Sequence, residues 1–348
     1  MISEKKEFIA VDYMKLFCAL LIVGLHTSVF AGVSEQAAFV FDEIVSRIGV
    51  PFFFLASGFF VAGKVEDGAK LMQYIKRLLL LYLVYSAIYL PQMILVWKRE
   101  GRAVTEWVSI FLRKFFLVGT YGQLWYFAGL ALAVVLLYLL VKLLKLPVAV
   151  NFTIAVMLYI VGVLGSTYKT WFASLPAIRN ILLGYYDIFE TTRNGLFFGL
   201  LFVMSGYYLR IYADKIKAGR KYIVFAGFLA VMLVAEAYFA SQFVIAEGFD
   251  MTFFLFPFSI FLFLGVCSVK VSKQQLEIGK KVRNISTLIF GFHLCVDFYL
   301  TEILCIRLGM TINSVLWYVL IVLLNLILAG VILWLSKYKF FKWLKLLY

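Results

Sequence analysis

Long apolar runs separated by short polar stretches occupy nearly the whole chain. Each run is about 18 to 24 residues long, enough for an α-helix rising 1.5 Å per residue to cross a hydrocarbon core of about 30 Å. The pattern therefore predicts ten membrane-spanning helices, over residues 8–30, 44–63, 77–97, 123–145, 148–167, 193–211, 222–243, 252–269, 284–306 and 313–336.

Composition supports this class. Hydrophobic residues make up 64% of the 348 residues and charged residues only 15%, and the mean hydropathy is +0.97. In soluble domains about a quarter of the residues are charged. No polar stretch of domain size lies between the runs. We therefore predict an all-α, polytopic transmembrane bundle of about ten helices that forms one domain over residues 1–348.

The net charge of +14 comes largely from basic residues in short loops. The outer loops 31–43 and 244–251 contain only acidic residues among their charges if the N-terminus is cytoplasmic. Basic clusters then fall on the inner side, near residues 64–77, 142–145, 215–221, 270–283 and 337–345. This positive-inside pattern predicts that both termini are cytoplasmic, and it accounts for the charge without a nucleic-acid partner.

The predicted outer loop 98–122 departs from that pattern because it contains several basic residues, among them Arg99, Arg102 and Arg113. Apolar residues recur at helical spacing over residues 104–118, which favours an interfacial or re-entrant helix. The basic residues could attract an anionic lipid or polymer, or they could simply anchor the helix among headgroups.

The first predicted helix contains three ionisable residues, Asp12, Lys15 and His26. Eleven residues are almost three helical turns, so Lys15 and His26 share a face, about 16 Å apart along the axis. Asp12 lies one turn before Lys15 on nearly the same face. Such groups are costly in hydrocarbon unless they face the bundle interior or a wet cavity, so we expect this face to line one. The candidate catalytic residues are therefore His26, Lys15 and Asp12.

Other polar residues interrupt the later runs. Asp297 follows His293 by one turn and could hold the second nitrogen of its imidazole. Trp125 could line a cavity mouth, and Glu236, Arg47 and Arg193 could neutralise one another. The candidate binding residues are Arg47, Ser57, Trp125, Arg193, Asn194, Glu236 and His293.

No metal site is predicted. The four cysteines, Cys18, Cys267, Cys295 and Cys305, lie within or beside apolar runs without paired spacing, and we interpret them as small buried hydrophobes. Motifs of soluble enzymes, such as a Walker-type glycine loop or a GxSxG elbow, do not occur in the sequence.

A family resemblance rests on five segments: DYMKLFCALLIVGLH, RIGVPFFFLASGFF, QLWYF, TRNGLFFGLLFVMSGYYL and STLIFGFH. In this order they resemble the membrane-bound acyltransferase-3 family over essentially the whole chain. The resemblance implies ten helices and transfer of an acyl group from a cytoplasmic acyl donor to an extracytoplasmic acceptor, typically a sugar of the cell envelope. It also implies a catalytic role for His26, which falls where the family's first-helix histidine falls.

The chemistry of these residues is compatible with acyl transfer. His26 could act as the general base on an acceptor hydroxyl, since the pKa of imidazole suits neutral pH. Arg47, Ser57 or Arg193 could donate hydrogen bonds to the oxyanion. Lys76 and Arg77, at the inner end of the third helix, could hold the phosphates of an acyl-CoA donor, with acetyl-CoA expected.

The sequence departs from the family pattern at three places. Lys15 stands where the family usually has an arginine, and lysine lacks the planar fork that makes bidentate contacts. Of the family's usual pair of arginines spaced by three residues near the third helix, only the basic pair Lys76 and Arg77 is present. The usual histidine before the Leu-Trp of the fourth helix is Gln123 here.

A narrower resemblance supplies a rival hypothesis. Several of these segments, with the EAY around Glu236 and with His293, are similar to the membrane half of vancomycin-resistance serine racemases, which is associated with supplying L-serine to a cytoplasmic racemase domain. The chain would then be a transporter or substrate-delivery module in which Lys15, Glu236, Arg193 and His293 bind a zwitterion. The sequence ends at Tyr348, just past the last predicted helix, so no racemase domain is expected. A catalytically inactive membrane partner is a third option.

The sequence thus favours a multi-pass protein of a bacterial inner (plasma) membrane. We expect membrane lipids and an envelope glycan or lipid-linked sugar acceptor as partners, and no nucleic acid. A homo-oligomer is an open alternative.

Overall fold

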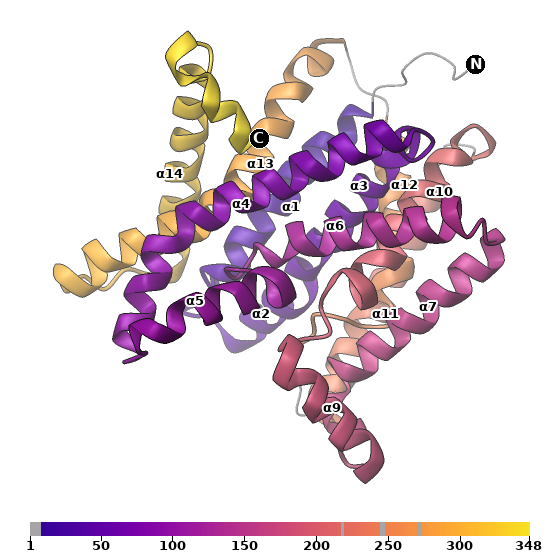
Figure 1. The fold of residues 1–348 in the computed structure, drawn as a ribbon, viewed down its shortest axis with the longest axis horizontal. Coiled ribbons are helices and arrows are strands. Elements are labelled where there is room, and N and C mark those ends of the chain that lie inside the picture. Colours follow the sequence, from indigo (N-terminus) through magenta and orange to yellow (C-terminus); the bar gives the residue numbers. More distant parts are fainter. Residues whose placement is uncertain (1–7, 217–218, 244–247, 270–272) are drawn as a thin grey trace.

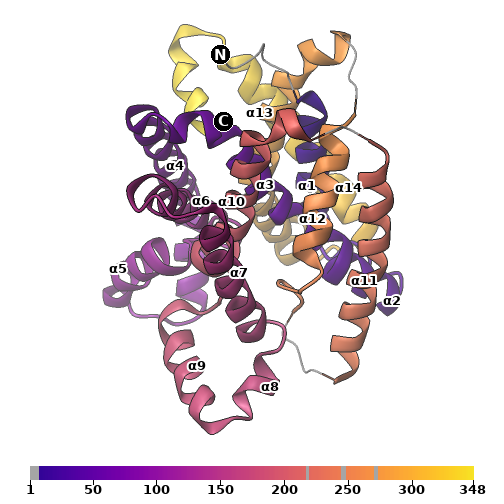
Figure 2. The ribbon, with the colours of Figure 1, turned by 90° about the vertical axis from the view of Figure 1, so that its right-hand side faces the viewer.

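The structure, a computed structural model, describes residues 8–216, 219–243, 248–269 and 273–348. It is a bundle of helices (Figures 1 and 2). The α-helices within these ranges are, in chain order, α1 (Ile9–His26), α2 (Glu35–Val40), α3 (Gly49–Val65), α4 (Gly68–Arg99), α5 (Val104–Arg113), α6 (Trp125–Tyr138), α7 (Val148–Gly165), α8 (Lys169–Ala173), α9 (Pro176–Phe189), α10 (Leu200–Ile211), α11 (Lys221–Phe243), α12 (Leu255–Cys267), α13 (Lys273–Leu300) and α14 (Ser314–Leu335).

Short π and 3₁₀ helical segments extend or connect several of these helices. They are η1 (Phe41–Val45), η2 (Ser46–Ile48), η3 (Lys114–Val118), η4 (Leu139–Leu143), η5 (Gly195–Gly199), η6 (Ala213–Lys215), η7 (Thr301–Arg307) and η8 (Lys339–Leu347).

Eight helical segments of the described chain are long and apolar enough to cross a membrane. They are Ile9–His26, Glu35–Val65, Gly68–Arg99, Trp125–Leu143, Val148–Gly165, Lys221–Gln242, Ile278–Arg307 and Ser314–Leu335. Two shorter apolar helices, Gly195–Ile211 and Leu255–Cys267, coincide with the remaining predicted spans. The predicted polytopic helical bundle is therefore confirmed.

Two boundaries differ from the prediction for identifiable reasons. Helix α4 begins at Gly68, well before residue 77, because the Asp67 carboxylate caps it by accepting the N–H groups of Ala69 and Lys70 at 3.0 and 3.2 Å. Helix α12 begins only at Leu255, because the preceding residues form a non-helical loop that other side chains hold inside the bundle.

The segment predicted to be an interfacial helix contains α5 and η3, and none of its residues is buried. The arginines of the surrounding predicted loop 98–122 have acidic partners nearby: Arg99 pairs with Glu302, Arg102 Nε lies 2.6 Å from Glu100, and Arg113 Nη2 lies 3.6 Å from Glu190. These pairs reduce the free positive charge that was expected of this loop. Its place relative to a membrane stays a prediction.

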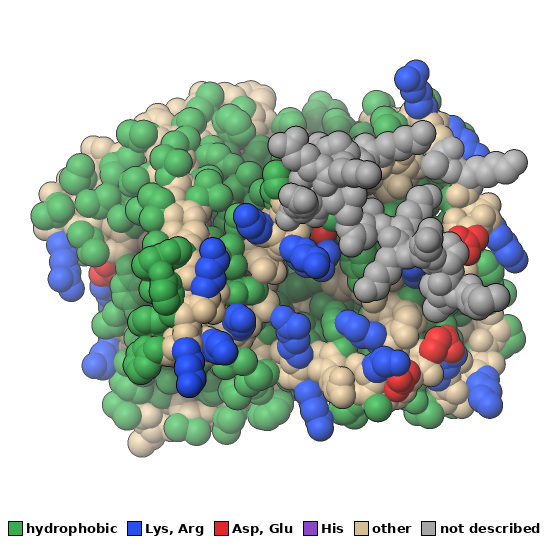
Figure 3. All heavy atoms as spheres, turned by 90° about the horizontal axis from the view of Figure 1, so that it is seen from above, with side chains coloured by type: hydrophobic (Ala, Val, Ile, Leu, Met, Phe, Trp, Pro, Cys, Tyr) green, Lys and Arg blue, Asp and Glu red, His purple; other side chains and the backbone are tan. Residues whose placement is uncertain are grey.

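The two ends of the bundle differ in their charged side chains. In Figure 2 the C-terminus lies at the upper end, and α8 and α9 lie at the lower end. Figure 3 views the upper end and shows Lys and Arg side chains spread across that face with few acidic ones. This is the end that the charge pattern predicts to be cytoplasmic; the charge assignments at residues 217–218, 244–247 and 270–272 lie outside the described residues.

Helices α3 and α10 pack with their backbones in close contact. A Cβ atom added to Gly58 would lie 2.0 Å from the main-chain oxygen of Val203, and one added to Gly206 would lie 2.1 Å from that of Leu55. Only glycine permits this backbone contact, which is the usual role of small residues between membrane helices.

We expect Gly58→Ala to lower the stability of the protein in detergent by about 1–3 kcal/mol, because the new methyl group must push α3 and α10 apart. Gly63→Ala, in the same helix, is the matched control: a Cβ there meets nothing within 4 Å, so the change should be neutral or stabilise by about 0.5–1 kcal/mol. Thermal midpoints of both variants test this, and equal shifts would contradict the assigned contact.

Candidate functional site

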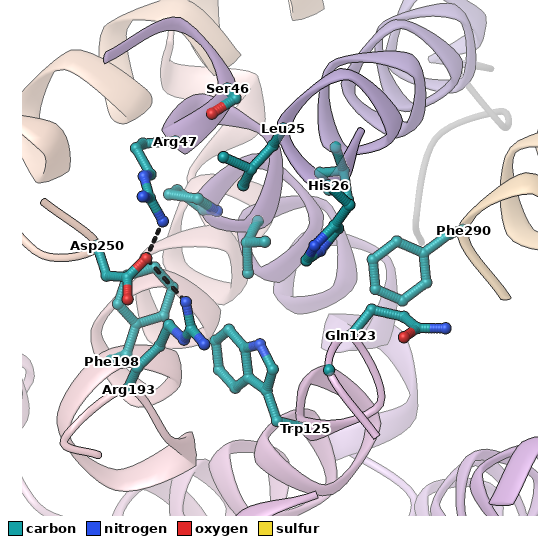
Figure 4. A pocket seen from close by; sticks show the side chains of 14 residues that line it. Leu25, His26, Ser46, Arg47, Gln123, Trp125, Arg193, Phe198, Asp250 and Phe290 are labelled. Atoms are coloured by element: carbon teal, nitrogen blue, oxygen red, sulfur yellow. Dashed lines mark hydrogen bonds and ion pairs between the residues drawn. The ribbon is translucent and has the colours of Figure 1, made fainter. Parts of the chain in front are cut away.

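A cavity of about 60 Å³ lies where α1 ends, between the start of α3, the start of α6 and the loop before α12. Its walls combine charged, amide and aromatic side chains with an apolar back. The lining residues are Ile22, Leu25, His26, Ser46, Arg47, Val50, Pro51, Gly122, Gln123, Trp125, Arg193, Phe198, Asp250 and Phe290. Figure 4 shows that the His26 ring, the Trp125 ring and the Arg193 side chain lie around the same space.

Asp250 is the centre of the charges in this cavity (Figure 4). Its Oδ1 accepts from Nη1 of Arg47 and lies 2.8 Å from Nη1 of Arg193. Arg47 also donates from Nη2 to Glu43, at 2.7 Å. The Arg193 guanidinium lies 5.1 Å from the centre of the Trp125 ring, a cation–π contact that fixes its orientation.

These charges are largely removed from water, since the Arg47 side chain is 13% exposed and the Asp250 side chain 23%. Burial alone would raise the pKa of the Asp250 carboxyl. The guanidinium groups of Arg193 and Arg47 outweigh that effect and hold the pKa below its ordinary value of 3.8. Asp250 is therefore an anion shared by two cations, and Asp250 and Glu43 together balance the charge of the two guanidinium groups.

His26 is the last residue of α1, and its side chain is exposed at the cavity. Its ring centre lies 5.2 Å from that of His293, a buried residue of α13. The Nδ1 atom of His293 lies 2.9 and 3.1 Å from the carbonyl oxygens of Phe290 and Ile289. Because carbonyls only accept, Nδ1 carries the proton and Nε2 is left as an acceptor.

Several buried polar atoms around the cavity have no hydrogen-bond partner within the described residues. They are Nε of Arg47, Nε of Arg193, Oε1 of Gln123 and Nε2 of His293. Buried polar groups are nearly always satisfied, so a group of unsatisfied ones marks a place where water or a polar ligand belongs. Arg47, Arg193 and Gln123 line the cavity, so two donors and one acceptor belong to its wall, and His293 adds an acceptor behind it, beside His26.

The loop that carries Asp250 is held by Glu236, a buried residue of α11. The Glu236 carboxylate accepts the backbone N–H groups of Phe253 and Phe254, both at 2.8 Å, and the hydroxyl of Tyr168 at 3.0 Å. Thr167 adds a hydrogen bond of 2.6 Å to the carbonyl of Met251. Glu236 does not line the cavity; it fixes the loop that places Asp250 there.

Two charge pairings differ from expectation. Glu236 was expected to neutralise Arg47 and Arg193, but Asp250 does so. Asp297 was expected to hold His293, but its Oδ1 instead accepts from the Trp317 indole nitrogen at 2.7 Å. In both cases the sequence offered a plausible partner, whereas the actual partner comes from another segment that only the fold brings close.

The other predicted binding residues have local structural contacts. Asn194 caps η5 by accepting the N–H groups of Leu196 and Phe197, both at 3.0 Å, and donates to the Tyr185 hydroxyl. Ser57 lies 3.0 Å from the hydroxyl of Tyr126 and is absent from the residues that line the cavity.

Asp12 and Lys15 lie toward the opposite end of α1 from His26. Asp12 is buried, and its two carboxylate oxygens accept from Nε and Nη2 of Arg283 at 2.9 and 2.8 Å, which ties α1 to α13. Lys15 Nζ lies 5.0 Å from the centre of the Phe60 ring. The structure therefore separates both residues from the cavity that His26 lines.

Lys76 and Arg77 are exposed on α4, away from the His26 cavity. Arg77 donates from Nη2 to the main-chain oxygen of Tyr348 at 2.7 Å.

Asp250 and Gln123 line the cavity with a carboxylate and an amide but are absent from the predicted site. Asp250 belongs to a predicted outer loop, residues 244–251, whose only charges are acidic, a signal that membrane topology explains equally well. Gln123 stands out in the sequence only as a departure from a family pattern. Its amide nitrogen donates to the Tyr89 hydroxyl at 2.6 Å, which leaves Oε1 without a partner in the described residues.

The comparison with known families agrees with this architecture. Residues 8–334 match the acyltransferase domain family, and the chain therefore belongs to the acyltransferase-3 family of multi-pass membrane proteins. No solved protein structure matches the chain.

Among curated proteins, the chain is similar to two amino-acid racemases of Enterococcus faecalis. One is 32% identical over 61% of this chain and 31% of the relative, and the other 23% identical over 94% of this chain and 46% of the relative. A serine/alanine racemase of Enterococcus gallinarum is 26% identical over 73% of this chain and 36% of the relative. The matches thus span less than half the length of these relatives.

We expect Asp250→Asn to destabilise the protein by roughly 1–3 kcal/mol at neutral pH, because two guanidinium groups lose their shared anion. Since the folded-state pKa of Asp250 is depressed, the stabilisation is present above about pH 4 and is lost as pH falls through the folded-state pKa. The difference between wild type and variant should therefore shrink in acid. Thermal midpoints from pH 7 to 3 test this, with exposed Asp214→Asn as control; a pH-independent difference would contradict it.

Proposed function

We propose that the protein is an O-acyltransferase of a bacterial plasma membrane. It would transfer an acyl group, acetyl being the simplest, from a cytoplasmic acyl-CoA to a hydroxyl of an envelope sugar or glycan. One observation carries the proposal: in a chain of the acyltransferase-3 family, His26 faces a cavity whose other polar groups include two cations and unsatisfied donors.

In this mechanism His26 takes the proton of the acceptor hydroxyl as its oxygen attacks the thioester carbonyl. A C–O bond forms, and the carbonyl oxygen becomes an oxyanion. When the tetrahedral intermediate collapses, the C–S bond breaks and coenzyme A leaves as a thiolate. The proton held by His26 passes to that sulfur, so the imidazole returns to its starting state.

Arg47 and Arg193 are the groups best suited to stabilise the oxyanion. Both line the cavity, and their Nε–H groups have no partner in the described residues. Fixed donors in a site from which water is largely excluded stabilise developing charge without having to reorganise. Asp250 would hold both guanidinium groups in place between turnovers.

His293 would act as a positioning residue. Its unprotonated Nε2 has no partner in the described structure, and its ring lies close to that of His26. If it accepts the N–H of His26, directly or through water, the other nitrogen of His26 is left free to act as the base. A neutral histidine would thus fill the orienting place that a carboxylate has in other catalytic pairs.

The acyl donor would approach from the opposite, cytoplasmic end. Lys76 and Arg77 are exposed there and could contact its phosphates. Lys15 and Asp12 would then act by holding α1 in place, because they lie away from the cavity.

We expect His26→Ala to lower the rate of acetyl transfer by about 10²–10⁴-fold, because the general base is lost. The assay follows radiolabelled acetyl groups from acetyl-coenzyme A into membrane glycolipids, with the purified chain in proteoliposomes. Added imidazole should restore part of the activity of His26→Ala but not affect wild type. Acetyl transfer at the wild-type rate by a folded His26→Ala protein would refute the role of His26.

A second function is favoured by the alternation of cation, anion and cation at Arg47, Asp250 and Arg193. An amino-acid zwitterion could replace these pairings, its carboxylate on a guanidinium and its ammonium on Asp250. The racemases named above act on amino acids by their names, which supports a serine-like ligand. The protein would then deliver or take up L-serine.

The two functions are separated by ligand-induced stabilisation, since a ligand that binds only the folded state raises the thermal midpoint with concentration. If the second function is correct, L-serine alone raises the midpoint, and Arg193→Gln abolishes the effect. The exposed Arg179→Gln is the matched control, because Arg179 does not line the cavity. A shift with acetyl-coenzyme A and none with L-serine would contradict the delivery hypothesis.

A further inference from the structure

A second cavity, of about 390 Å³, lies at the other end of the bundle from His26. It is bordered by the first turns of the membrane-spanning part of α13, the last turns of α14 and the C-terminal segment η8. The lining residues are Lys281, Asn284, Gly330, Leu333, Trp334, Ser336, Lys337, Lys345 and Tyr348. They come from three segments that meet only in the fold.

The polar wall of this cavity is strongly cationic. Lys281, Lys337 and Lys345 all line it, and none of them forms an ion pair with a carboxylate in the part of the chain that the structure describes. Asn284 adds an amide. Three unpaired ammonium groups around one hollow repel one another, so an anion bound between them would be favoured.

Hydrogen bonds hold the wall of this cavity in place. The Tyr348 hydroxyl lies 2.8 Å from Oγ of Ser336, and Arg77 of α4 donates to the main-chain oxygen of Tyr348. Tyr85, also on α4, donates to the main-chain oxygen of Leu347 at 3.0 Å. These contacts hold η8 against the bundle and fix the position of its lysines.

The segment η8 has the character of a membrane-surface helix. Its inner face buries Leu344 and Leu347, while Phe340 is 84% exposed and Trp343 58% exposed. Aromatic side chains left exposed beside lysines at the end of a membrane bundle favour the headgroup region. Figure 3 views this end of the molecule, where Lys and Arg predominate.

The floor of the cavity is apolar and open. It is formed by Gly330, Leu333 and Trp334 of α14, and a Cβ atom added to Gly330 would meet nothing within 4 Å. A cationic rim above an open apolar floor fits an amphiphile whose head is anionic.

We propose that this cavity binds a phosphate group at the cytoplasmic surface of the membrane. Lysine ammonium groups bind phosphate as point charges and do not need the planar fork of arginine. The phosphate could belong to an anionic phospholipid or to a soluble phosphate compound; both share this chemistry. The proposal is independent of the reaction assigned to the His26 cavity.

The alternative is a diffuse attraction between a basic surface and anionic lipid, without a site. The chain contains a matched control for it. Lys339 and Lys342 belong to the same segment as Lys345 and do not line the cavity. Replacing them removes as much charge as replacing Lys337 and Lys345.

The test measures the thermal midpoint of the full chain in detergent against phosphatidylglycerol, phosphatidylcholine, coenzyme A and inorganic phosphate. The variants are Lys337→Gln with Lys345→Gln, the control pair Lys339→Gln with Lys342→Gln, and Gly330→Leu, which fills the floor without changing charge. We expect the first pair and Gly330→Leu to weaken the apparent affinity about tenfold or more, and the control pair by much less.

The outcomes identify the source of the phosphate or refute the site. A shift of the midpoint is cavity-dependent if the pair Lys337→Gln with Lys345→Gln weakens it and the control pair does not. Such a shift with phosphatidylglycerol alone assigns a lipid headgroup, and one with coenzyme A or inorganic phosphate assigns a soluble phosphate. Equal losses in both lysine pairs with Gly330→Leu unchanged would show diffuse attraction and overturn the proposal, as would no cavity-dependent shift with any probe. If Gly330→Leu lowers the midpoint without ligand, the comparison of the two lysine pairs decides between a site and diffuse attraction.

Discussion

The carboxylate of Asp250 holds together the end of the bundle at which His26 lies. It lies between two guanidinium groups from segments far apart in the sequence, Arg47 before α3 and Arg193 before η5. Without this anion Arg193 would lose its carboxylate partner and Arg47 would keep only Glu43, which would be costly at partly buried positions. Glu236 keeps Asp250 in position indirectly, because its carboxylate binds the backbone of the non-helical loop on which Asp250 lies.

This arrangement also explains why the cavity is suited to chemistry. The ion cluster, His26 and Gln123 line one cavity at one end of several apolar helices, where the charges are paired with one another and largely removed from water. Fixed charges in such a place stabilise a charged ligand or transition state more strongly than they would in bulk water. Acyl transfer and amino-acid binding would use the same groups, with His26 essential only to the first.

The basic side chains around the two cavities differ in whether they have acidic partners. At the end where His26 lies, the cations are neutralised by acidic residues, and the cavity is small. At the end predicted to be cytoplasmic, the lysines of the second cavity lack acidic partners within the described residues. The positive-inside bias explains why basic residues gather there, but it does not explain why Lys281, Lys337 and Lys345 surround one hollow with an apolar floor.

The sequence by itself determined the helical bundle and the ten apolar segments that form it, because runs of apolar residues in a membrane leave the backbone no alternative to the helix. The polar residues that interrupt or flank these runs also point to His26, Arg47, Trp125 and Arg193 as members of the site. Only the tertiary structure decided which charges meet: it brought Asp250 to the arginines and His293 to His26, and it gave Asp12 and Glu236 structural roles. Periodicity fixes which residues share a helix face, whereas an ion pair depends on which helices pack together, and no local pattern encodes that.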